Sequence, residues 1–322
     1  MPVWRMLIMR ISILGVGSIG GLLLGSLGTT NHELVAVSRG LTAKRISLEG
    51  LALYKHNGVI EVLAPDRFQV VDTDIPVSYN EFEKCDLAII CGKSGDTEEL
   101  ARIADQILKN EGIAITIQNG LGNVEILSGV LGSDRVVGGS TTHGAWRDED
   151  GGVHWAGNGD ITIGSVKKRD PRGIEIEIIE TFNSAGLNSH WTEDLQSSLW
   201  SKAMINVAIN PVCAISGIRN GVLEKEPMLL SLSFAAAHEV ARVAQARGID
   251  IPVIDIEEHV LEVIKSTSDN RCSMLQDLMA GRPTEIDQLC GTVGELAEIH
   301  GIAVPVNTTL HALVRAIEMS NV

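Results

Sequence analysis

The stretch "RISILGVGSIGGLLLGSL" (residues 10–27) decides the fold. An apolar run at 11–14 predicts a strand, and a second apolar run after the glycines predicts a helix. Between them stands the pattern Gly-x-Gly-x-x-Gly, which consists of Gly15, Val16, Gly17, Ser18, Ile19 and Gly20. A further strand, "HELVAVSR" (32–39), closes a βαβ unit of about thirty residues, and this context makes an otherwise weak motif informative.

Residues 15–20, here called the glycine turn, predict a dinucleotide site. Gly15 permits the tight turn, Gly17 lets the backbone approach a pyrophosphate, and Gly20 lets the helix pack closely on the strand. The helix N-terminus then presents N–H groups and the positive end of its dipole to the anion. The alternative is a glycine-rich turn that holds no ligand.

The end of the second strand discriminates between NAD and NADP. An NAD site commonly has an acid there, which binds the ribose 2′-hydroxyl, whereas arginine suits a 2′-phosphate. This chain has Ser38, Arg39 and Gly40 at that point, and Glu33 stands at the strand's start. NADP(H) is therefore the predicted cofactor, with NAD as the alternative.

The remainder of the first half predicts a parallel sheet. Three further apolar, β-branched runs predict strands at 85–93, 112–120 and 135–145, with helical stretches between them. Such runs are typical of parallel strands covered on both faces. Ligands of these sheets bind outside the carboxyl ends of the strands, where Lys93, Asn119 and Ala145 should lie. Lys93 is there either a cofactor-phosphate ligand or an ordinary solvated lysine. Residues 151–164 predict a hairpin that completes the domain.

The composition narrows the class of protein. The chain has 322 residues, 44% of them hydrophobic, and a net charge of −15. Binders of nucleic acid or of anionic membranes need a basic surface, so neither kind of partner is expected. A negatively charged ligand would have to meet local positive groups rather than the field of the whole protein.

The cysteines are odd in number and lack CxxC or metal-binding spacing: Cys85, Cys91, Cys213, Cys272 and Cys290. This favours a reducing cytoplasm and thiols buried as small apolar groups. Cys91 falls close to the predicted cofactor site, which leaves a reactive thiol as the alternative there. We expect no metal site.

The N-terminus imitates a secretory signal, because two arginines precede an uncharged apolar run. The glycines of that run fit a strand–turn–helix unit better. We therefore predict a soluble, cytoplasmic protein in which residues 1–8 form an extension before a strand that begins near Met9.

The second half changes to a helical pattern. Helices are predicted at 193–208, 225–247, 254–268, 283–300 and 306–319. Gly248 and Gly301 are placed as C-terminal stops. The predicted domains are therefore residues 1–191 and residues 192–322.

Within the first of these helices, Lys202, Asn206 and Asn210 recur every fourth residue and share one face, while apolar side chains cover the rest. Burying an amide without a partner costs about 1–3 kcal/mol, and an unpaired ammonium costs far more. The stripe therefore lines a polar ligand or water. The alternative is a narrow solvent-facing stripe.

A second polar cluster lies in residues 272–287. Pro283 suits the first turn of a helix, and Glu285 close to that N-terminus is either an ordinary helix-start acid or a functional one. Ser273 is either a functional hydroxyl or a simple cap.

Taken together, five motifs resemble the ketopantoate reductase family. They are the glycine turn, "QNGLGN" (118–123), "TTHGA" (141–145), "LWSKAMINVAINP" (199–211) and "SMLQDLMAGRPTEID" (273–287). They occur in the family's order and span almost the whole chain beyond residue 9. The resemblance implies a Rossmann-type α/β domain and an all-α C-terminal domain like that of 6-phosphogluconate dehydrogenase. It also implies NADPH-dependent reduction of 2-dehydropantoate (ketopantoate) to (R)-pantoate, in pantothenate and coenzyme A synthesis.

Carried over residue by residue, the resemblance implies that Lys202 is the general acid and Glu285 its supporting carboxylate. The implied substrate ligands are Asn119, Lys202, Asn206, Asn210, Asn220 and Ser273. The implied cofactor ligands are the glycine turn, Arg39, Lys93, Asn119 and Ala145. Gln288–Gly291 depart from the family's usual Tyr-Ile-Asn-Gly type of run, which puts the edge of the pocket in doubt but leaves Glu285 in place.

Three alternatives remain. One is a reductase of another branched 2-oxo acid, and another is a relative of 6-phosphogluconate or 3-hydroxyacid dehydrogenases. The third is a non-catalytic NADP(H)-sensing protein, against which the retention of Lys202, Glu285 and the asparagines argues. The predicted partner is a small 2-oxo acid, and the sequence leaves a homodimer open.

Overall fold

The chain divides into two compact units. The structure, a computed structural model, describes residues 8–76, 79 and 82–320, so the predicted extension lies almost wholly outside the described residues. Unit 1 contains the chain up to Gln118 together with Asn123–Leu195, and unit 2 contains Asn119–Gly122 and the chain from Gln196 onward. The sequence pattern did not predict that residues 119–122 belong to the second unit.

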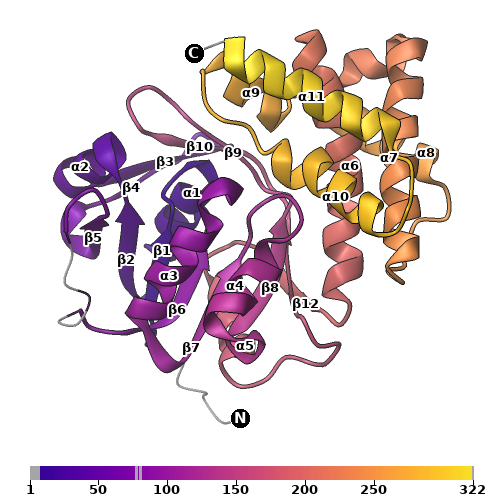
Figure 1. Cartoon of the computed structure of the whole chain (residues 1–322). Coiled ribbons are helices and arrows are strands. Elements are labelled where there is room, and N and C mark those ends of the chain that lie inside the picture. Colours follow the sequence, from indigo (N-terminus) through magenta and orange to yellow (C-terminus); the bar gives the residue numbers. More distant parts are fainter. Residues whose placement is uncertain (1–7, 77–78, 80–81, 321–322) are drawn as a thin grey trace. The chain divides into compact units, whose positions relative to one another are not determined.

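Unit 1 is built on an eight-stranded sheet, and the predicted parallel strands are confirmed (Figure 1). Its order is β12 (Ser189–Thr192), β11 (Ile161–Ser165), β8 (Val136–Thr141), β7 (Leu108–Thr116), β6 (Cys85–Ile90), β1 (Arg10–Leu14), β2 (Glu33–Ser38) and β5 (Phe68–Asp72). All neighbours are parallel except β8 and β11. The nearly continuous apolar runs follow from burial of these strands on both faces.

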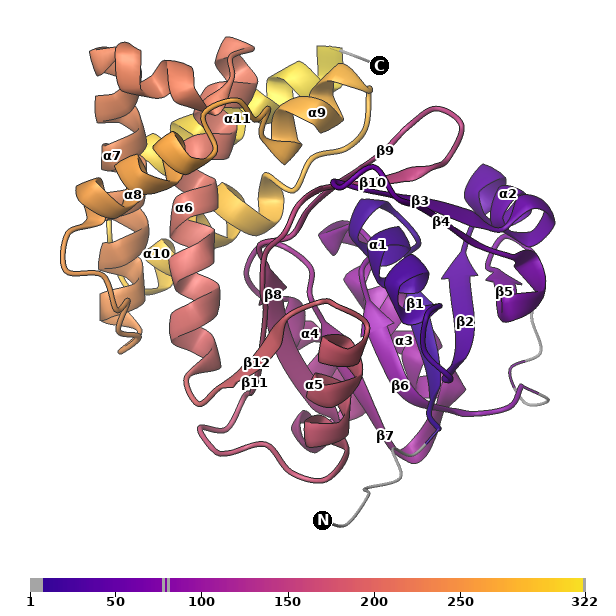
Figure 2. The same cartoon turned by 180° about the vertical axis from the view of Figure 1, so that it is seen from behind.

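Among the described residues of unit 1, five α-helices accompany this sheet: α1 (Ser18–Leu27), α2 (Gly40–Glu49), α3 (Thr97–Ile107), α4 (Asn123–Leu131) and α5 (Ile174–Ser184). Helices α3 and α4 pack against each other beside β6, β7 and β8 (Figure 1). The view from behind shows α5, which shares a core with α1 (Figure 2).

A second, four-stranded sheet covers α1. Its order is β4 (Ile60–Leu63), β3 (Leu51–Lys55), β10 (Val153–Gly157) and β9 (Gly144–Arg147). The glycines of α1 allow this close approach, since a Cβ on Gly21 would lie 2.6 Å from Val153 Cγ2.

The predicted hairpin at 151–164 is wrong. Strand β10 belongs to the small sheet and β11 to the large one, and their true partners are β9 and β8. One antiparallel ribbon passes from sheet to sheet, pairing Thr141 with Ile161 and Gly144 with Gly157. Strand β10 pairs with the preceding strand β9 and with β3, while β11 pairs with β8 and β12, so the turn residues between β10 and β11 do not reveal their partners.

Unit 2 is helical, as predicted. Its helices are α6 (Leu195–Ser216), α7 (Pro227–Ala246), α8 (Ile256–Ser266), α9 (Ser273–Met279), α10 (Thr292–Ile299) and α11 (Pro305–Ser320), with a 3₁₀ segment at Asn220–Lys225 and a π-helical turn at Asp287–Gly291. Gly248 and Gly301 follow α7 and α10 with φ of +71° and +64°, which confirms both stops. None of the helices described is long and apolar enough to cross a bilayer.

Helix α6 runs past the predicted end at 208 and contains Pro211. A proline inside a helix costs about 3 kcal/mol. Val212 and Cys213, just beyond it, are buried in the core of unit 2. Burial of each such side chain contributes about 1.5–3 kcal/mol, which outweighs the local penalty.

The helix predicted at 283–300 begins later than expected. Pro283 and Glu285 precede the π-helical turn, and regular α10 starts only at Thr292. The Thr284 N–H donates to Glu318 Oε1 on α11 at 2.7 Å, so a tertiary contact replaces the first helical turn.

Glu239 on α7 fixes the start of α11. This carboxylate is 3% exposed and accepts from the N–H groups of Val306 and Asn307 at 3.1 and 2.9 Å. It also accepts from Asn307 Nδ2 at 2.9 Å. These are first-turn N–H groups that have no partner within their own helix.

We therefore predict that Glu239→Ala lowers the free energy of unfolding by about 3 kcal/mol, because buried donors lose their acceptor. Urea unfolding measures this change. Glu257→Ala, which removes an exposed pair with His238, is the control and should cost less than about 1 kcal/mol. Equal effects of the two variants would contradict the assignment.

Candidate functional site

The three glycines of the glycine turn differ in whether the packing of the protein itself requires a glycine. Gly15 has φ of +94°, and a Cβ there would lie 2.4 Å from the backbone N of Gly92. A Cβ on Gly20 would lie 2.0 Å from the Gly15 carbonyl oxygen. A Cβ on Gly17 would meet no atom of the described residues within 4 Å. Internal packing thus requires the first and third glycines but not the second.

The other predicted cofactor residues of unit 1 follow neighbouring strands. Arg39 comes after β2 and precedes α2, and its guanidinium pairs with Asp96 at 3.1 Å. Lys93 comes after β6 and precedes the short 3₁₀ turn Ser94–Asp96. Because β2 and β6 both flank β1, these residues and the glycine turn lie at the carboxyl edge of the same three strands. Ala145 lies instead in β9 of the small sheet.

Gln118 is a residue that sequence reasoning left without a role. Its Nε2 donates to the carbonyl oxygens of Gly92 and Lys93 at 2.9 and 3.2 Å. Its Oε1 accepts from the hydroxyls of Thr97 and Thr116 at 3.2 and 2.9 Å. Gln118 thereby fixes the end of unit 1 from which the chain enters 119–122. The motif "QNGLGN" carried this signal, but only its first asparagine received a function.

Segment 119–122 is held by unit 2. Leu121 is buried in the helical core, and its N–H donates to the carbonyl oxygen of Gln288 at 2.9 Å. Gly120 has φ of +88°, and a Cβ there would lie 2.7 Å from the same carbonyl oxygen. A larger residue at 120 would therefore push the segment away from the π-helical turn.

Three predicted site residues meet in unit 2. Lys202 Nζ on α6 donates to Asn119 Oδ1 at 2.8 Å. Asn119 Nδ2 donates to Glu285 Oε2 at 3.0 Å. The amide thus links an amine to a carboxylate, and we call Lys202, Asn119 and Glu285 the polar relay. Asn119 lies 83 positions from Lys202 and 166 positions from Glu285 along the chain, so the fold brings distant residues together in the relay.

Burial lowers the pKa of Lys202 to about 8, and the nearby negative charge of Glu285 opposes part of this shift. Desolvation penalises the charged amine, while the carboxylate stabilises it. The amine therefore remains mostly protonated at neutral pH yet releases its proton far more readily than an exposed lysine.

The remaining predicted substrate residues are also placed in unit 2. Asn206 is partly buried on α6, and Asn210 is buried one turn further on. Lys202 and Asn206 thus keep part of their surface exposed, whereas Asn210 is buried, so the stripe is not fully open to solvent.

Asn220 opens the 3₁₀ segment and is 6% exposed. Its Nδ2 donates to Thr267 Oγ1 at 3.0 Å, but its Oδ1 is buried without a hydrogen-bond partner among the described residues. Ser273 is exposed at the start of α9. The N-cap of that helix is Cys272, whose sulfur accepts from the Leu275 N–H, so the alternative of Ser273 as a simple cap is wrong.

Segment 267–273 connects these residues. The Asn220 N–H donates to the carbonyl oxygen of Asn270 at 3.0 Å. Cys272 Sγ donates to the Asn210 carbonyl oxygen at 3.4 Å. Asn210, Asn220 and Ser273 are therefore anchored to one stretch of backbone.

Helix α11 supports the carboxylate end of the polar relay. Besides the bond from Thr284 to Glu318, Asp287 Oδ1 lies 2.6 Å from His311 Nε2 and its Oδ2 lies 3.7 Å from an Arg315 nitrogen. These contacts fix the backbone on both sides of Glu285. The sequence pattern did not predict these contacts, because they join α11 to a segment that lies well before it in the chain.

The cysteines are free thiols, four of them buried and Cys91 partly buried, as expected. Burial raises the pKa of the Cys91 thiol far above neutrality. The predicted inert packing of Cys91 is thus supported, and the reactive-thiol alternative is not.

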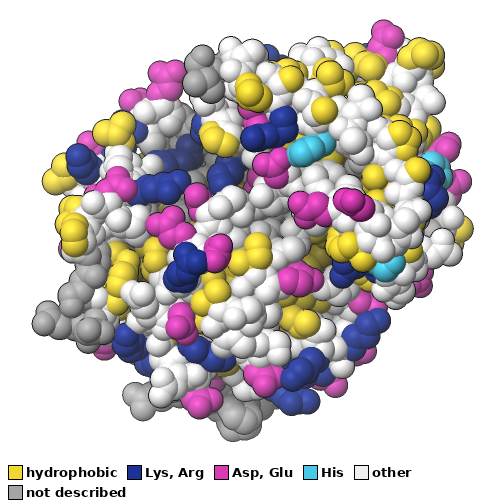
Figure 3. Space-filling model, in the orientation of Figure 1, with side chains coloured by type: hydrophobic (Ala, Val, Ile, Leu, Met, Phe, Trp, Pro, Cys, Tyr) yellow, Lys and Arg dark blue, Asp and Glu magenta, His cyan; other side chains and the backbone are white. Residues whose placement is uncertain are grey.

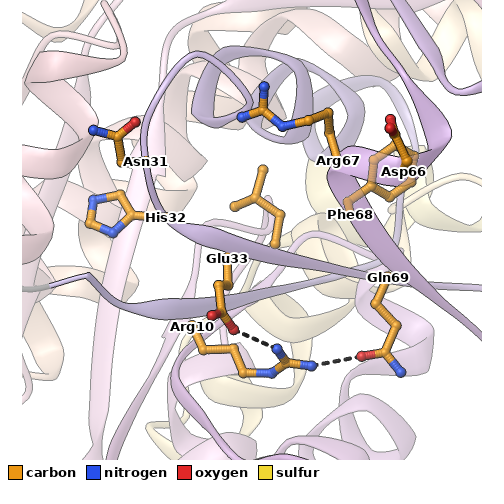
Figure 4. A pocket seen from close by; sticks show the side chains of 9 residues that line it. Arg10, Asn31, His32, Glu33, Asp66, Arg67, Phe68 and Gln69 are labelled. Atoms are coloured by element: carbon orange, nitrogen blue, oxygen red, sulfur yellow. Dashed lines mark hydrogen bonds and ion pairs between the residues drawn. The ribbon is translucent and has the colours of Figure 1, made fainter.

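A surface pocket lies elsewhere on unit 1 (Figure 4). It is lined by Arg10, Asn31, His32, Glu33, Leu34, Asp66, Arg67, Phe68 and Gln69. Arg10, Glu33 and Phe68 are the first residues of β1, β2 and β5, so the pocket lies at the amino ends of these strands. Ligands of parallel sheets bind at the opposite, carboxyl edge. None of the predicted site residues is among the described residues that line this pocket.

Comparison with known proteins gives consistent matches along the chain. A sequence profile described as "Ketopantoate reductase PanE/ApbA" matches residues 11–168, and one described as its C-terminal part matches residues 194–318. The 2-dehydropantoate 2-reductase of Pyrococcus horikoshii is 34% identical over 311 residues, which are 96% of this chain and 98% of that protein. The one from Halobacterium salinarum is 36% identical over 310 residues, 95% of this chain and 98% of that protein. A solved PanE/ApbA family ketopantoate reductase from Ralstonia eutropha has a TM-score of 0.86 at 26% identity, covering 97% of this chain and 99% of that one.

The polar relay predicts a measurable titration. Lys202 should titrate with a pKa of about 8. Glu285→Gln should move the midpoint to lower pH, because it removes the charge that raises this pKa. NMR of protein labelled with ¹³C-lysine, with the signal assigned by Lys202→Met, measures both midpoints. Glu298→Gln, an exposed acid of the same unit, is the control. A midpoint near the ordinary value of 10.5 would contradict the burial of the amine.

Proposed function

The chain belongs to the ketopantoate reductase family, and from this premise we propose that it reduces 2-dehydropantoate to (R)-pantoate with NADPH, as a step of pantothenate and coenzyme A synthesis. The observation that carries the proposal is the polar relay, in which a partly buried amine with a pKa of about 8 is linked through Asn119 to a carboxylate. Ketone reduction needs a proton donor of this kind.

Unit 1 supplies the cofactor ligands in this proposal. The open side of Gly17 and the start of α1 suit a pyrophosphate, since the N–H groups of a first helical turn have no partner within the helix. Arg39 follows β2, where an arginine suits a 2′-phosphate. Lys93, at the same edge of the sheet, adds a positive charge. When bound, the reduced nicotinamide supplies a hydride to the carbonyl carbon.

Unit 2 supplies the acid in this proposal. When the hydride reaches the carbonyl carbon, negative charge develops on the carbonyl oxygen, and Lys202 donates a proton to that oxygen. The neutral amine then regains a proton from solvent. Asn119 orients the amine, and Glu285 keeps it protonated at neutral pH. Reduction should therefore slow as pH rises through about 8, where Lys202 loses its proton.

Polar groups of unit 2 match the other parts of the substrate. The carboxylate of 2-dehydropantoate needs donors, which the Ser273 hydroxyl and side-chain amides provide. Its hydroxyl needs an acceptor, and the buried Oδ1 of Asn220 lacks a donor among the described residues. A buried acceptor without a donor costs about 1–3 kcal/mol, so a ligand whose hydroxyl donates to it would be favoured over an analogue that lacks this hydroxyl.

The alternatives differ from this proposal in what they require. A reductase of another branched 2-oxo acid would keep the acid and change the groups around the substrate's side chain. An NADP(H)-sensing protein would have no use for a proton donor with a lowered pKa. The curated relatives also bear the name 2-dehydropantoate 2-reductase along nearly their full length, which favours ketopantoate.

The decisive experiment follows nicotinamide absorbance with a panel of 2-oxo acids and either NADPH or NADH. We expect the highest kcat/KM with ketopantoate and NADPH. Lys202→Met should lower kcat by at least about a hundredfold, the usual scale for a general acid, while NADPH still binds. Lys265→Met, which removes an exposed lysine paired with Glu224, is the control. A Lys202 variant with normal turnover would refute the mechanism, and preference for another 2-oxo acid would refute the substrate.

The glycine turn gives a further prediction. Gly17→Ala should leave thermal stability unchanged, because its Cβ meets no atom of the described residues, but should raise the Kd for NADPH by about tenfold or more as the methyl group obstructs the pyrophosphate. Gly20→Ala should instead lower the melting temperature, because its Cβ would lie 2.0 Å from the Gly15 carbonyl oxygen. Calorimetry and fluorescence titration separate the two effects. Unchanged NADPH binding by Gly17→Ala would contradict the proposed site.

A further inference from the structure

Arg147, at the end of β9, reaches the glycine turn within unit 1. Its Nη1 donates to the Val16 carbonyl oxygen at 2.9 Å and to Thr42 Oγ1 at 3.1 Å. Its Nη2 donates to the Gly151 carbonyl oxygen at 3.3 Å. One guanidinium therefore ties the small sheet both to the glycine turn and to α2.

The surroundings of Arg147 are unfavourable for a purely structural cation. Its Nε is buried without a hydrogen-bond partner in the described part of the chain, and the acceptors recorded there for its other two nitrogens are neutral oxygens. Burial and the nearby Arg45 lower the pKa of Arg147, and Asp148 opposes this only in part. Desolvating a charge without a bonded counter-charge is costly. Basic side chains gather over this part of unit 1, around α2 and the β9–β10 hairpin (Figure 3).

The bond to Val16 fixes the direction of one peptide group. In a trans peptide the C=O and the following N–H point in opposite directions. Because Arg147 holds the Val16 carbonyl oxygen, the N–H of Gly17 is turned away from the guanidinium. If this peptide flipped, a carbonyl oxygen would replace that N–H and would repel an anion.

We propose that Arg147 is a positioning residue for the dinucleotide: it fixes the Val16–Gly17 peptide so that the N–H, and not the carbonyl oxygen, faces the pyrophosphate. The inference rests on the proposed function only in taking the ligand of the glycine turn to be a dinucleotide. The pyrophosphate is common to NADPH and NADH. Arg147 therefore acts equally on both nucleotides, unlike a residue that binds the 2′-phosphate.

The test compares Arg147→Met and Arg147→Lys with Arg45→Met. Arg45 donates to the Glu149 carbonyl oxygen, so its loss removes an equal charge from the same region but no bond to the glycine turn. Isothermal titration gives the Kd for NADPH and for NADH, calorimetry gives the melting temperature, and kinetics give kcat at saturating NADPH. The ¹⁵N–¹H signal of Gly17 reports the peptide directly.

We expect Arg147→Met to raise both dissociation constants by the same factor, about tenfold or more, as loss of a charge-assisted hydrogen bond predicts. The value of kcat at saturation should stay within about twofold, the Gly17 signal should move, and Arg45→Met should stay within about threefold of wild type in Kd. Arg147→Lys keeps the charge and one donor group and should fall between wild type and Arg147→Met, which provides the readout should the methionine variant fail to fold.

Two results would overturn the inference. Dissociation constants within about twofold of wild type in both Arg147 variants would show that the peptide needs no such support. Weaker binding of NADPH alone would instead make Arg147 a direct 2′-phosphate ligand. A wild-type protein that binds neither nucleotide would refute the proposed cofactor as well, so the two failures are distinguishable.

Discussion

The polar relay of unit 2 depends on accommodating one partly buried ammonium group, that of Lys202. Removing an unpaired charge from water is prohibitive, so the amine of Lys202 must either lose its proton or find compensating groups. It finds an amide oxygen at 2.8 Å and a carboxylate beyond that amide. The result is a pKa of about 8, which is below that of an ordinary lysine but still high enough to keep the amine mostly protonated at neutral pH. A proton donor needs this intermediate state, since it must hold its proton and also release it.

Such a balance requires that Asn119 and Glu285 stay in place, and much of unit 2 serves this purpose. Leu121 inserts into the helical core, and its N–H bonds to the π-helical turn. Glu318 of α11 holds the residue before Glu285, and Glu239 of α7 in turn holds the start of α11. The π-helical turn, a rare conformation often found at functional sites, begins two residues after Glu285. The support therefore extends from the amine of Lys202 to helices far along the chain.

The sequence predicted the parts whose cause is local. The glycine turn, the parallel strands and the helical half were readable because strand and helix periodicity and glycine geometry act over a few residues. The hairpin predicted at 151–164 was wrong because β10 pairs with β9 and β3 in the small sheet, while β11 pairs with β8 and β12 in the large one. Helix α6 was predicted too short because core burial outweighs the penalty of Pro211, and Glu318 displaced the helix start expected at Pro283. The polar relay needed the family resemblance, since spacing placed only Lys202 on a polar face, and Arg147 had no sequence signal at all.

A strongly acidic chain must generate its own local positive charge to handle anions, and three cations show how it does so. Arg169 pairs with the buried carboxylate of Glu175 through two bonds of 2.6 Å, which neutralises both groups and makes the pair structural. Lys202 and Arg147 instead donate to neutral oxygens, those of Asn119 and Val16. A neutral acceptor fixes the direction of a cation without cancelling its charge, so the field remains available to a ligand. In these three residues the acceptor therefore decides whether the charge is neutralised, as in Arg169, or stays available, as in Lys202 and Arg147.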